Sequence, residues 1–240
     1  MVIECFQEHP EIRRDDCAVV VIDVIRATTT AITAAAAGRR CFPVPSLEAA
    51  LSLRQLLPNA LLAGELAGNI PHNFDLNNSP AEIAARSDVD RPLILLSSSG
   101  TQLIHAASHC NFTYLACFRN FASLVEYLID RHSRVVLIGA GTRGEFREED
   151  QLCCAWIAHR LISAGYEPED ERTFSIVLHW GTAGVEACLC SKSVDYLRRS
   201  GQTQDLDFTL NHINDLPHVF RMRDGEVAMA ATPACISAAP

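Results

Sequence analysis

The first long apolar run of the chain carries an aspartate and an arginine at its end. Asp23 lies near the end of Ala18–Val24, and Arg26 and Thr28 follow it. A carboxylate at the carboxyl end of a parallel strand faces the edge at which open α/β sheets bind ligands. Because a guanidinium fork, hydroxyls and free helix N–H groups suit a phosphate, we predict a phosphate site here. An N-cap aspartate paired with a structural arginine would explain the same residues equally well.

Asp23 is not expected to act as the nucleophile of a haloacid-dehalogenase-type phosphatase. Those enzymes carry a second aspartate two residues later as the general acid, and this chain has Ile25 there. The carboxylate is therefore assigned to acid–base chemistry or to metal binding.

A long segment rich in Gly, Asn and Pro, Gly64–Ser79, supplies two further carboxylates. Loops of this length in compact domains are often functional. If Glu65 and Asp75 met Asp23 without compensation, the three charges would repel one another. A hard cation with oxygen ligands removes that conflict, so we predict Mg²⁺ bound by Asp23, Glu65 and Asp75. Ser79 also resembles a helix N-cap, because Pro80 and Glu82 follow it.

Two turns rich in Gly and Thr follow later apolar runs and predict further contacts to an anion. Backbone N–H groups of such turns can form a concave anion site. The second turn opens like a dinucleotide fingerprint, but the acids that follow it would repel a pyrophosphate, which argues against NAD binding. The candidate residues of these turns are Ser98, Ser99, Gly100 and Thr101, then Gly141 and Thr142.

Apolar runs alternate with segments of helical periodicity along most of the chain. This alternation predicts a three-layer α/β fold with a mostly parallel sheet and helices on both faces. We expect a single domain over residues 1–240 that can be divided into two similar halves of about 1–115 and 116–240, and an edge strand at Glu226–Met229. The predicted strands are Ala18–Val24, Pro92–Leu96, Arg134–Ile138 and Thr173–Leu178. The predicted helices are Thr29–Gly38, Leu47–Leu57, Gln102–Ser108, Phe121–Arg131, Glu148–Ala164 and Thr182–Leu197.

Composition limits the partners of the chain. A formal net charge of −9 argues against a nucleic-acid or anionic-membrane surface, which would need clustered Lys and Arg. No apolar run is long enough for a membrane helix, and Met1–Asp16 is too acidic for a signal peptide, so we expect a cytoplasmic protein. The ten cysteines lie mostly in apolar runs and are expected to be buried, reduced thiols.

Four ordered segments together resemble the 2-phosphosulfolactate phosphatase family. They are VVVIDVIRATTT, GELAGNIPHNFDLNNSPAEI, LLSSSGTQLI and VVLIGAGTRGEFREEDQLCCAWI, and LDFTLNHINDLPHVFRMRDGEV is similar to the closing segment of that family. The resemblance implies a Mg²⁺-dependent phosphatase that acts on a small phosphorylated hydroxy acid, and we also expect a homodimer. It implies site roles for Asp23, Arg26, Glu65, Asp75, Asn78, Ser79, Gly100, Thr101, Gly141, Thr142, Glu149 and Asp150, with Glu149 and Asp150 as further catalytic candidates. For these two acids, stabilisation of the helix N-terminus is the alternative reading.

The chain departs from the family pattern at four positions. Leu66 replaces an arginine, Asn73 and Asn77 replace glycines, and Ser99 replaces an asparagine. Loss of an arginine at an anion site can remove charge-assisted hydrogen bonds. The alternatives to a phosphosulfolactate phosphatase are therefore a related enzyme with another substrate, and a non-catalytic metabolite-binding or assembly protein.

Overall fold

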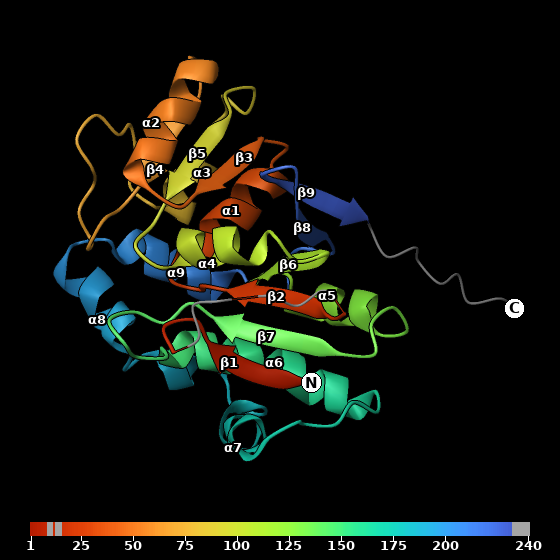
Figure 1. Ribbon diagram of the computed structural model, residues 1–240. Coiled ribbons are helices and arrows are strands. Elements are labelled where there is room, and N and C mark those ends of the chain that lie inside the picture. Colours follow the sequence, from red (N-terminus) through yellow and green to blue (C-terminus); the bar gives the residue numbers. More distant parts are fainter. Residues whose placement is uncertain (9–11, 13–15, 232–240) are drawn as a thin grey trace, which may run out of the picture.

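Two separate sheets form the framework of this computed structural model, which describes residues 1–8, 12 and 16–231 (Figure 1). The larger sheet has the strand order β1-β7-β2-β6-β8-β9 and the smaller has the order β3-β5-β4. All neighbours are parallel except at β6–β8 and β8–β9. The strands are β1 (Val2–Cys5), β2 (Ala18–Ile22), β3 (Cys41–Val44), β4 (Leu61–Gly64), β5 (Leu93–Leu96), β6 (Phe112–Ala116), β7 (Val135–Gly139), β8 (Val219–Arg223) and β9 (Glu226–Ala231).

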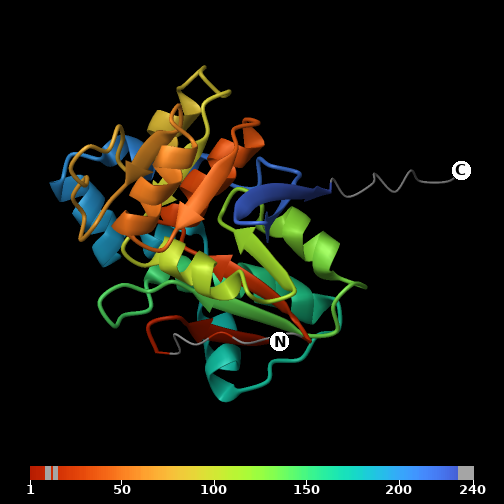
Figure 2. The same cartoon turned by 45° about the horizontal axis from the view of Figure 1, so that its top comes forward.

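Helices cover both sheets and fill the space between them (Figures 1 and 2). Helices α1 and α4 contact strands of both sheets, α6 and α7 pack on the other face of the larger sheet, and α2 covers the smaller one. The helices are α1 (Ala27–Ala36), α2 (Leu47–Leu56), α3 (Pro80–Ala84), α4 (Gly100–Ala107), α5 (Phe121–Leu128), α6 (Glu148–Ser163), α7 (Glu171–Trp180), the 3₁₀ helix η1 (Val185–Cys188), α8 (Lys192–Arg199) and α9 (Thr203–Asn211). The predicted α/β fold with a mostly parallel sheet between helices is confirmed, and the smaller sheet with α2 adds two layers to it.

Burial explains why these runs form strands. Every residue of β2, β5 and β7 is buried, as expected for parallel strands with helices on both faces. Side chains of β2 alternate between the core shared with α6 and the core shared with α1 and the smaller sheet. Alanines of α1 and the cysteine pair of α6 are buried in these cores. The described cysteines are free thiols, and all but Cys190 are buried.

One predicted strand is wrong. Thr173–Leu178 lies inside helix α7, which begins after Asp170, whose side chain accepts a hydrogen bond from Thr173 N at 2.6 Å. Only one side of the helix is buried, since Phe174 and Leu178 are among the exposed apolar residues. The apolar run of this segment misled the strand prediction. The cap at Asp170 and packing on one side of the segment favour a helix over its strand propensity.

The helix predicted after that strand is also placed differently. The region Thr182–Leu197 begins with a turn and η1, and its α-helix starts only at Lys192. Strands β1, β3, β4, β6 and β8 were not predicted, mainly because runs of four or five residues carry little periodicity. The edge strand expected at Glu226–Met229 is present as β9.

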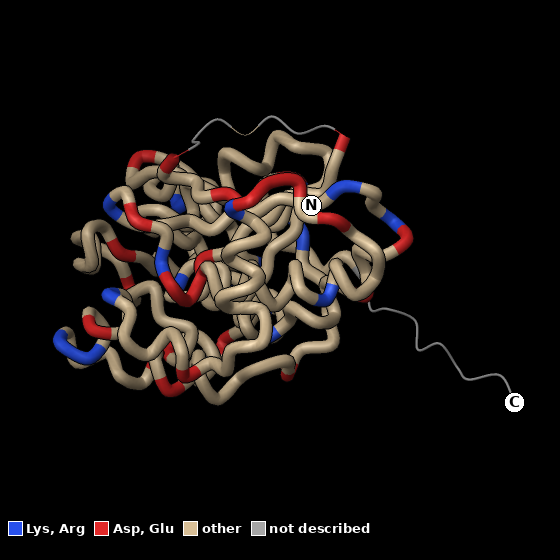
Figure 3. The backbone as a smooth tube through the Cα atoms, turned by 90° about the horizontal axis from the view of Figure 1, so that it is seen from below, with Lys and Arg blue, Asp and Glu red and all other residues tan. Residues whose placement is uncertain are grey.

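The charge distribution is mixed. Lys and Arg positions lie among Asp and Glu positions around much of the backbone (Figure 3). Within the described part of the chain, none of the helices combines the length and apolar character that crossing a bilayer requires. A local cluster of Lys and Arg therefore stands out against this mixed background, and one such cluster lies in the cavity described below.

Candidate functional site

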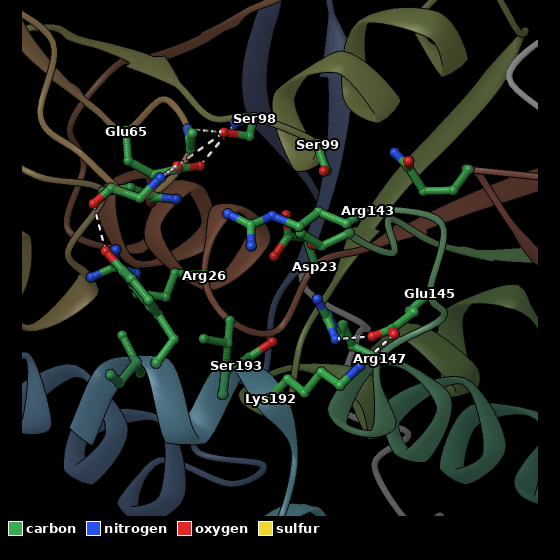
Figure 4. A pocket seen from close by; sticks show the side chains of 18 of the residues that line it. Asp23, Arg26, Glu65, Ser98, Ser99, Arg143, Glu145, Arg147, Lys192 and Ser193 are labelled. Atoms are coloured by element: carbon green, nitrogen blue, oxygen red, sulfur yellow. Dashed lines mark hydrogen bonds and ion pairs between the residues drawn. The ribbon is translucent and has the colours of Figure 1, made fainter. Parts of the chain in front are cut away.

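A cavity of about 600 Å³ opens where the carboxyl ends of parallel strands from both sheets meet. Gln7 follows β1, Asp23 follows β2, Glu65 follows β4, Ser99 follows β5 and Arg143 follows β7. Helix α8 supplies the facing wall (Figure 4). Ligands of open α/β sheets bind at this edge, so the cavity is the candidate active site.

Asp23 lies at the buried end of this cavity with 8 % of its surface exposed. Its Oδ1 accepts a hydrogen bond from Ala27 N at 3.2 Å, and no described residue donates to its Oδ2. Burial is the main cause that raises its pKa to about 7, and the nearby charges of Glu65 and Glu149 add to the rise. A carboxyl group with this pKa can gain or lose a proton near neutral pH, as a general acid or base must.

Thr28 and Gly100 hold Asp23 in place rather than lining the cavity. The Thr28 hydroxyl accepts a hydrogen bond from Asp23 N at 3.0 Å and lies 2.8 Å from the carbonyl oxygens of Asp23 and Ala116. Gly100 begins α4 directly against the Asp23 carboxylate, where a side chain would collide with it. Of these two predicted substrate-binding residues, Thr28 thus fixes the backbone of Asp23 and Gly100 leaves room for its carboxylate.

Glu149 and Asp150 form a buried acidic cluster behind Asp23. Asp150 Oδ1 accepts a hydrogen bond from Val24 N at 2.8 Å, and burial followed by the charges of Asp23 and Glu149 raises its pKa well above the usual value. Burial also raises the pKa of Glu149, against the hydrogen bonds of Ser193 and Ser191, and its Oε2 has no hydrogen-bond partner among the described residues. Neither acid lines the cavity, so their direct effect is on the electrostatics of Asp23.

Arg26 is fixed by residues from a distant part of the chain. Its Nη1 donates to Asp205 Oδ2 at 2.6 Å and to Gln202 Oε1 at 2.5 Å, and its Nη2 lies 3.4 Å from Asn77 Oδ1. Arg26 and Asp205 are 5 % and 1 % exposed. Arg26 lines the cavity, but its charge is compensated by Asp205, a residue that no sequence motif singled out.

Asn78 and Ser79 divide between the cavity and this network. Asn78 lines the cavity, and its buried Oδ1 has no hydrogen-bond partner among the described residues. Ser79 caps α3 and donates its hydroxyl to Asp205 Oδ1 at 2.5 Å. The predicted N-cap is therefore present, and Asn78 keeps a polar atom for a ligand.

The loop acids separate from one another. Glu65 lines the cavity, and its carboxylate accepts hydrogen bonds from Ser98 N, Ser98 Oγ and Gly68 N at 2.8, 3.0 and 2.7 Å. Asp75 is not part of the cavity wall, because its carboxylate bonds Leu62 N at 2.9 Å and lies 3.7 Å from Arg54. The structure thus brings Glu65 to Asp23 but leaves Asp75 on the smaller sheet.

This arrangement limits the way in which a metal could be held. Among the residues that the structure describes, no three His, Cys, Asp or Glu side chains converge as a metal cage. Mg²⁺ in phosphoryl-transfer sites is commonly held by one or two carboxylates together with waters and phosphate oxygens. Asp23, with its free Oδ2, and Glu65 fit that smaller donor set.

The serine-rich turn after β5 combines bracing and cavity-lining residues. Ser97 and Thr101 exchange hydrogen bonds of 2.9 Å between their backbone N–H groups and hydroxyls, which closes the turn. Ser98 and Ser99 line the cavity, and Ser99 makes no side-chain capping bond. Of the predicted anion contacts in this turn, these two serines are in position to touch a ligand, while Thr101 is turned inward.

The segment after β7 contributes cations that sequence analysis overlooked. Thr142 lines the cavity, whereas Gly141 does not, and Arg143 and Arg147 follow on the same segment. Lys192 reaches the cavity from α8 and pairs with Glu145, which also accepts a hydrogen bond from Arg147 Nη1 at 2.5 Å (Figure 4). The available signal was the pair of arginines in GTRGEFREED, which its four acids outweighed in a count of charges.

The family departures do not strip the cavity of cations. The Leu66 side chain does not line the cavity, and Arg26, Arg143, Arg147 and Lys192 do. Asn73 adopts a φ of 64°, in the left-handed region that Asn tolerates better than most residues. The amide nitrogen of Asn77 donates to Gln202 Oε1 at 2.6 Å and so joins the Arg26 network.

Comparison with known proteins found one matching family model and several relatives. A family model described as 2-phosphosulpholactate phosphatase matches residues 4–224. A probable 2-phosphosulfolactate phosphatase of Pseudothermotoga lettingae is 35% identical over 161 residues, 67% of this chain and 69% of the relative. Relatives with the same description from Deinococcus radiodurans and Clostridium perfringens are 31% and 28% identical, over 79% and 87% of this chain and 81% and 87% of their own lengths.

Proposed function

Because the chain belongs to the 2-phosphosulpholactate phosphatase family, whose members are phosphoric monoester hydrolases, we propose that it hydrolyses a small phosphorylated hydroxy acid such as 2-phosphosulfolactate. The observation that carries this proposal is Asp23, a buried carboxyl group that lines the cavity at the ligand edge of the sheet and whose Oδ2 accepts no hydrogen bond from a described residue. Arg26 lies beside it in the same cavity.

Each residue of the cavity has a definable part in this reaction. Next to the cation proposed below, Asp23 would be ionised, so its carboxylate would orient the attacking water and accept a proton from it. Arg26 and the Ser99 hydroxyl border the place where the phosphoryl group would lie, whereas the orphan Asn78 Oδ1, an acceptor, suits a cation or a bound water. Because Asp205 and Gln202 fix the guanidinium of Arg26, little of its conformational entropy is lost when it binds.

The proposal includes Mg²⁺ next to Asp23 and Glu65. A phosphate dianion placed beside these two carboxylates would be repelled, and the charge of Arg26 is already balanced by Asp205. When bound, the cation would neutralise the phosphate and draw charge from its oxygens. This site differs from the set expected from sequence, because Asp75 takes no part in it. A cytoplasmic homodimer stays a prediction.

Turnover with and without metal tests the proposal. Purified protein is assayed on 2-phosphosulfolactate and p-nitrophenyl phosphate, with Mg²⁺, with EDTA, and with EDTA followed by excess Mg²⁺. We expect hydrolysis that EDTA abolishes and Mg²⁺ restores. Full activity in EDTA would refute the metal, and no turnover of either substrate by folded protein would favour the non-catalytic alternative.

A further inference from the structure

The wall of the cavity formed by the β7–α6 segment and α8 carries a local excess of positive charge. Arg143, Arg147 and Lys192 line it, and Glu145 is the acid that accompanies them. In a chain with a net charge of −9, three cations and a single acid on this part of the cavity wall are a marked departure. The other side of the cavity carries Asp23 and Glu65, so the cavity has a negative and a positive side.

Arg147 points to a missing partner on the positive side. It is 8 % exposed, its Nη1 donates to Glu145, and its buried Nε has no hydrogen-bond partner among the described residues. A buried donor of a charged group that stays unpaired costs free energy, which an oxyanion in the cavity would recover. Arg143 also has no ion pair among the described residues, and its side chain reaches into the cavity (Figure 4).

Glu145 occupies the place that the acid group of a ligand would take. Its carboxylate bridges Arg147 and Lys192, which come from different elements (Figure 4). The Lys192 ammonium, more than Arg147, holds the pKa of Glu145 below its usual value, so the bridge is ionised at neutral pH. The Glu145 side chain is 46% exposed and that of Lys192 is 67% exposed, so the pair between them contributes little to stability and can be exchanged at small cost.

We propose that Arg143, Arg147 and Lys192 bind the second acid group of the substrate, a sulfonate or a carboxylate, and that Glu145 is the built-in counter-ion that this group displaces. The inference rests on the proposed function for the identity of the substrate. The phosphoryl end lies at Asp23 and the acid end lies against the positive wall. The two sides of the cavity therefore select a phosphomonoester that carries a further acid and fix its orientation.

The proposal predicts opposite effects for the two partners of the Glu145–Lys192 pair. Glu145→Gln removes the competing charge, so the variant should bind small acids more tightly. Lys192→Gln removes a cation and should weaken binding by about tenfold, the equivalent of one charge-assisted hydrogen bond. Both side chains are well exposed, so neither variant should fail to fold. Glu186→Gln, an exposed acid outside the cavity, is the matched control.

Calorimetric titration with ethanesulfonate and with propanoate, each of which carries a single acid group, measures this without turnover. We expect Glu145→Gln to bind at least one of these acids about three- to tenfold more tightly than the unchanged protein, with Glu186→Gln unchanged. The probe that gains more identifies the acid as a sulfonate or a carboxylate. Unchanged or weaker binding of both probes by Glu145→Gln, or no loss in Lys192→Gln, would overturn the proposal.

Kinetics then separate this inference from the proposed function. The ratio of kcat/KM for 2-phosphosulfolactate to that for p-nitrophenyl phosphate should fall in Lys192→Gln, because p-nitrophenyl phosphate has no second acid. If no substrate is turned over but the acids bind as expected, the phosphatase proposal fails and the acid site stands. If turnover is normal and the ratio is unchanged, the acid site fails alone.

Discussion

A β carbon on Gly100 would lie 2.0 Å from Oδ2 of Asp23. The first residue of α4 and the carboxylate after β2 therefore occupy neighbouring space in which a side chain does not fit. The same β carbon would lie 2.5 Å from Cβ of Ala27, so the start of α1 closes the gap from the other side. The position of the Asp23 side chain thus depends on the absence of a side chain at Gly100 in α4.

The variant Gly100→Ala should disable the site more than it destabilises the fold. The new methyl group must push the carboxylate aside, and a displacement of about 1 Å at a catalytic group can cost about 100-fold in rate. Overpacking of this kind costs roughly 1–3 kcal/mol in the free energy of unfolding. Both quantities are measurable, by turnover and by urea denaturation.

Gly184→Ala is the matched control for this change. Its new β carbon would meet Oε2 of Glu186, the end of an exposed and flexible side chain, which can move away. If Gly100→Ala loses no more activity than Gly184→Ala, the proposed role of the Asp23 position is contradicted.

Replacing Asp23 with Asn should abolish turnover and stabilise the metal-free protein at alkaline pH. The folded-state pKa of Asp23 is raised to about 7, so the folded protein holds this proton more strongly than the unfolded chain. The free energy of unfolding therefore falls as pH rises from about 4 to about 7, and the full penalty applies above that range. Asn escapes this penalty.

Denaturation in EDTA at two pH values shows whether Asp23→Asn is more or less stable than the unchanged protein. We expect Asp23→Asn to be more stable than the unchanged protein by roughly 1–3 kcal/mol at about pH 8, with little difference at about pH 4. A variant that is less stable at both pH values would contradict the raised pKa of the buried carboxyl group.

Sequence reasoning found Asp23 because its position at the end of an apolar run has a structural meaning. The same reasoning placed Asp75 at the metal because it counted acids within one loop. The structure shows that Asp75 ties the end of that loop to strand β4 through Leu62 N, and the sequence contains nothing that distinguishes these two uses of a carboxylate.

Partners that are distant in the sequence could not be predicted, for a different reason. Asp205 lies 179 positions from Arg26, in a polar helix that matches no catalytic motif. Without an alignment of related sequences, pairing between such positions leaves no trace in one chain. The mostly parallel α/β fold could be predicted because buried strands are apolar along their whole length, whereas the split into two sheets depends on which strands pair.

Glu149→Gln should lower the pKa of Asp23. The negative charge of Glu149 is one of the causes that raise this pKa, after burial and Glu65, so removing it favours the ionised form of Asp23. Carboxyl NMR titration of the metal-free protein should show the Asp23 midpoint below its value of about 7 in the unchanged protein.

Glu148→Gln supplies the comparison, because Glu148 precedes Glu149 on α6 and is not among the charges that act on Asp23. We expect its Asp23 titration to match that of the unchanged protein. Equal shifts in both variants would show that the effect comes from the net charge of the helix start rather than from the buried Glu149 carboxylate.

Breaking the Arg26–Asp205 pair should be costly because the arginine cannot return to water. Asp205→Asn leaves a guanidinium that is 5 % exposed without a compensating charge, which typically costs about 3–5 kcal/mol. Asp207→Asn changes an exposed residue of the same helix and should be within about 0.5 kcal/mol of the unchanged protein. The double variant Arg26→Met with Asp205→Asn should lose less stability than the sum of the single changes, with a coupling of roughly 1–3 kcal/mol. Additive losses would show that Asp205 stabilises the start of α3 through Ser79 and Ala81 N rather than Arg26.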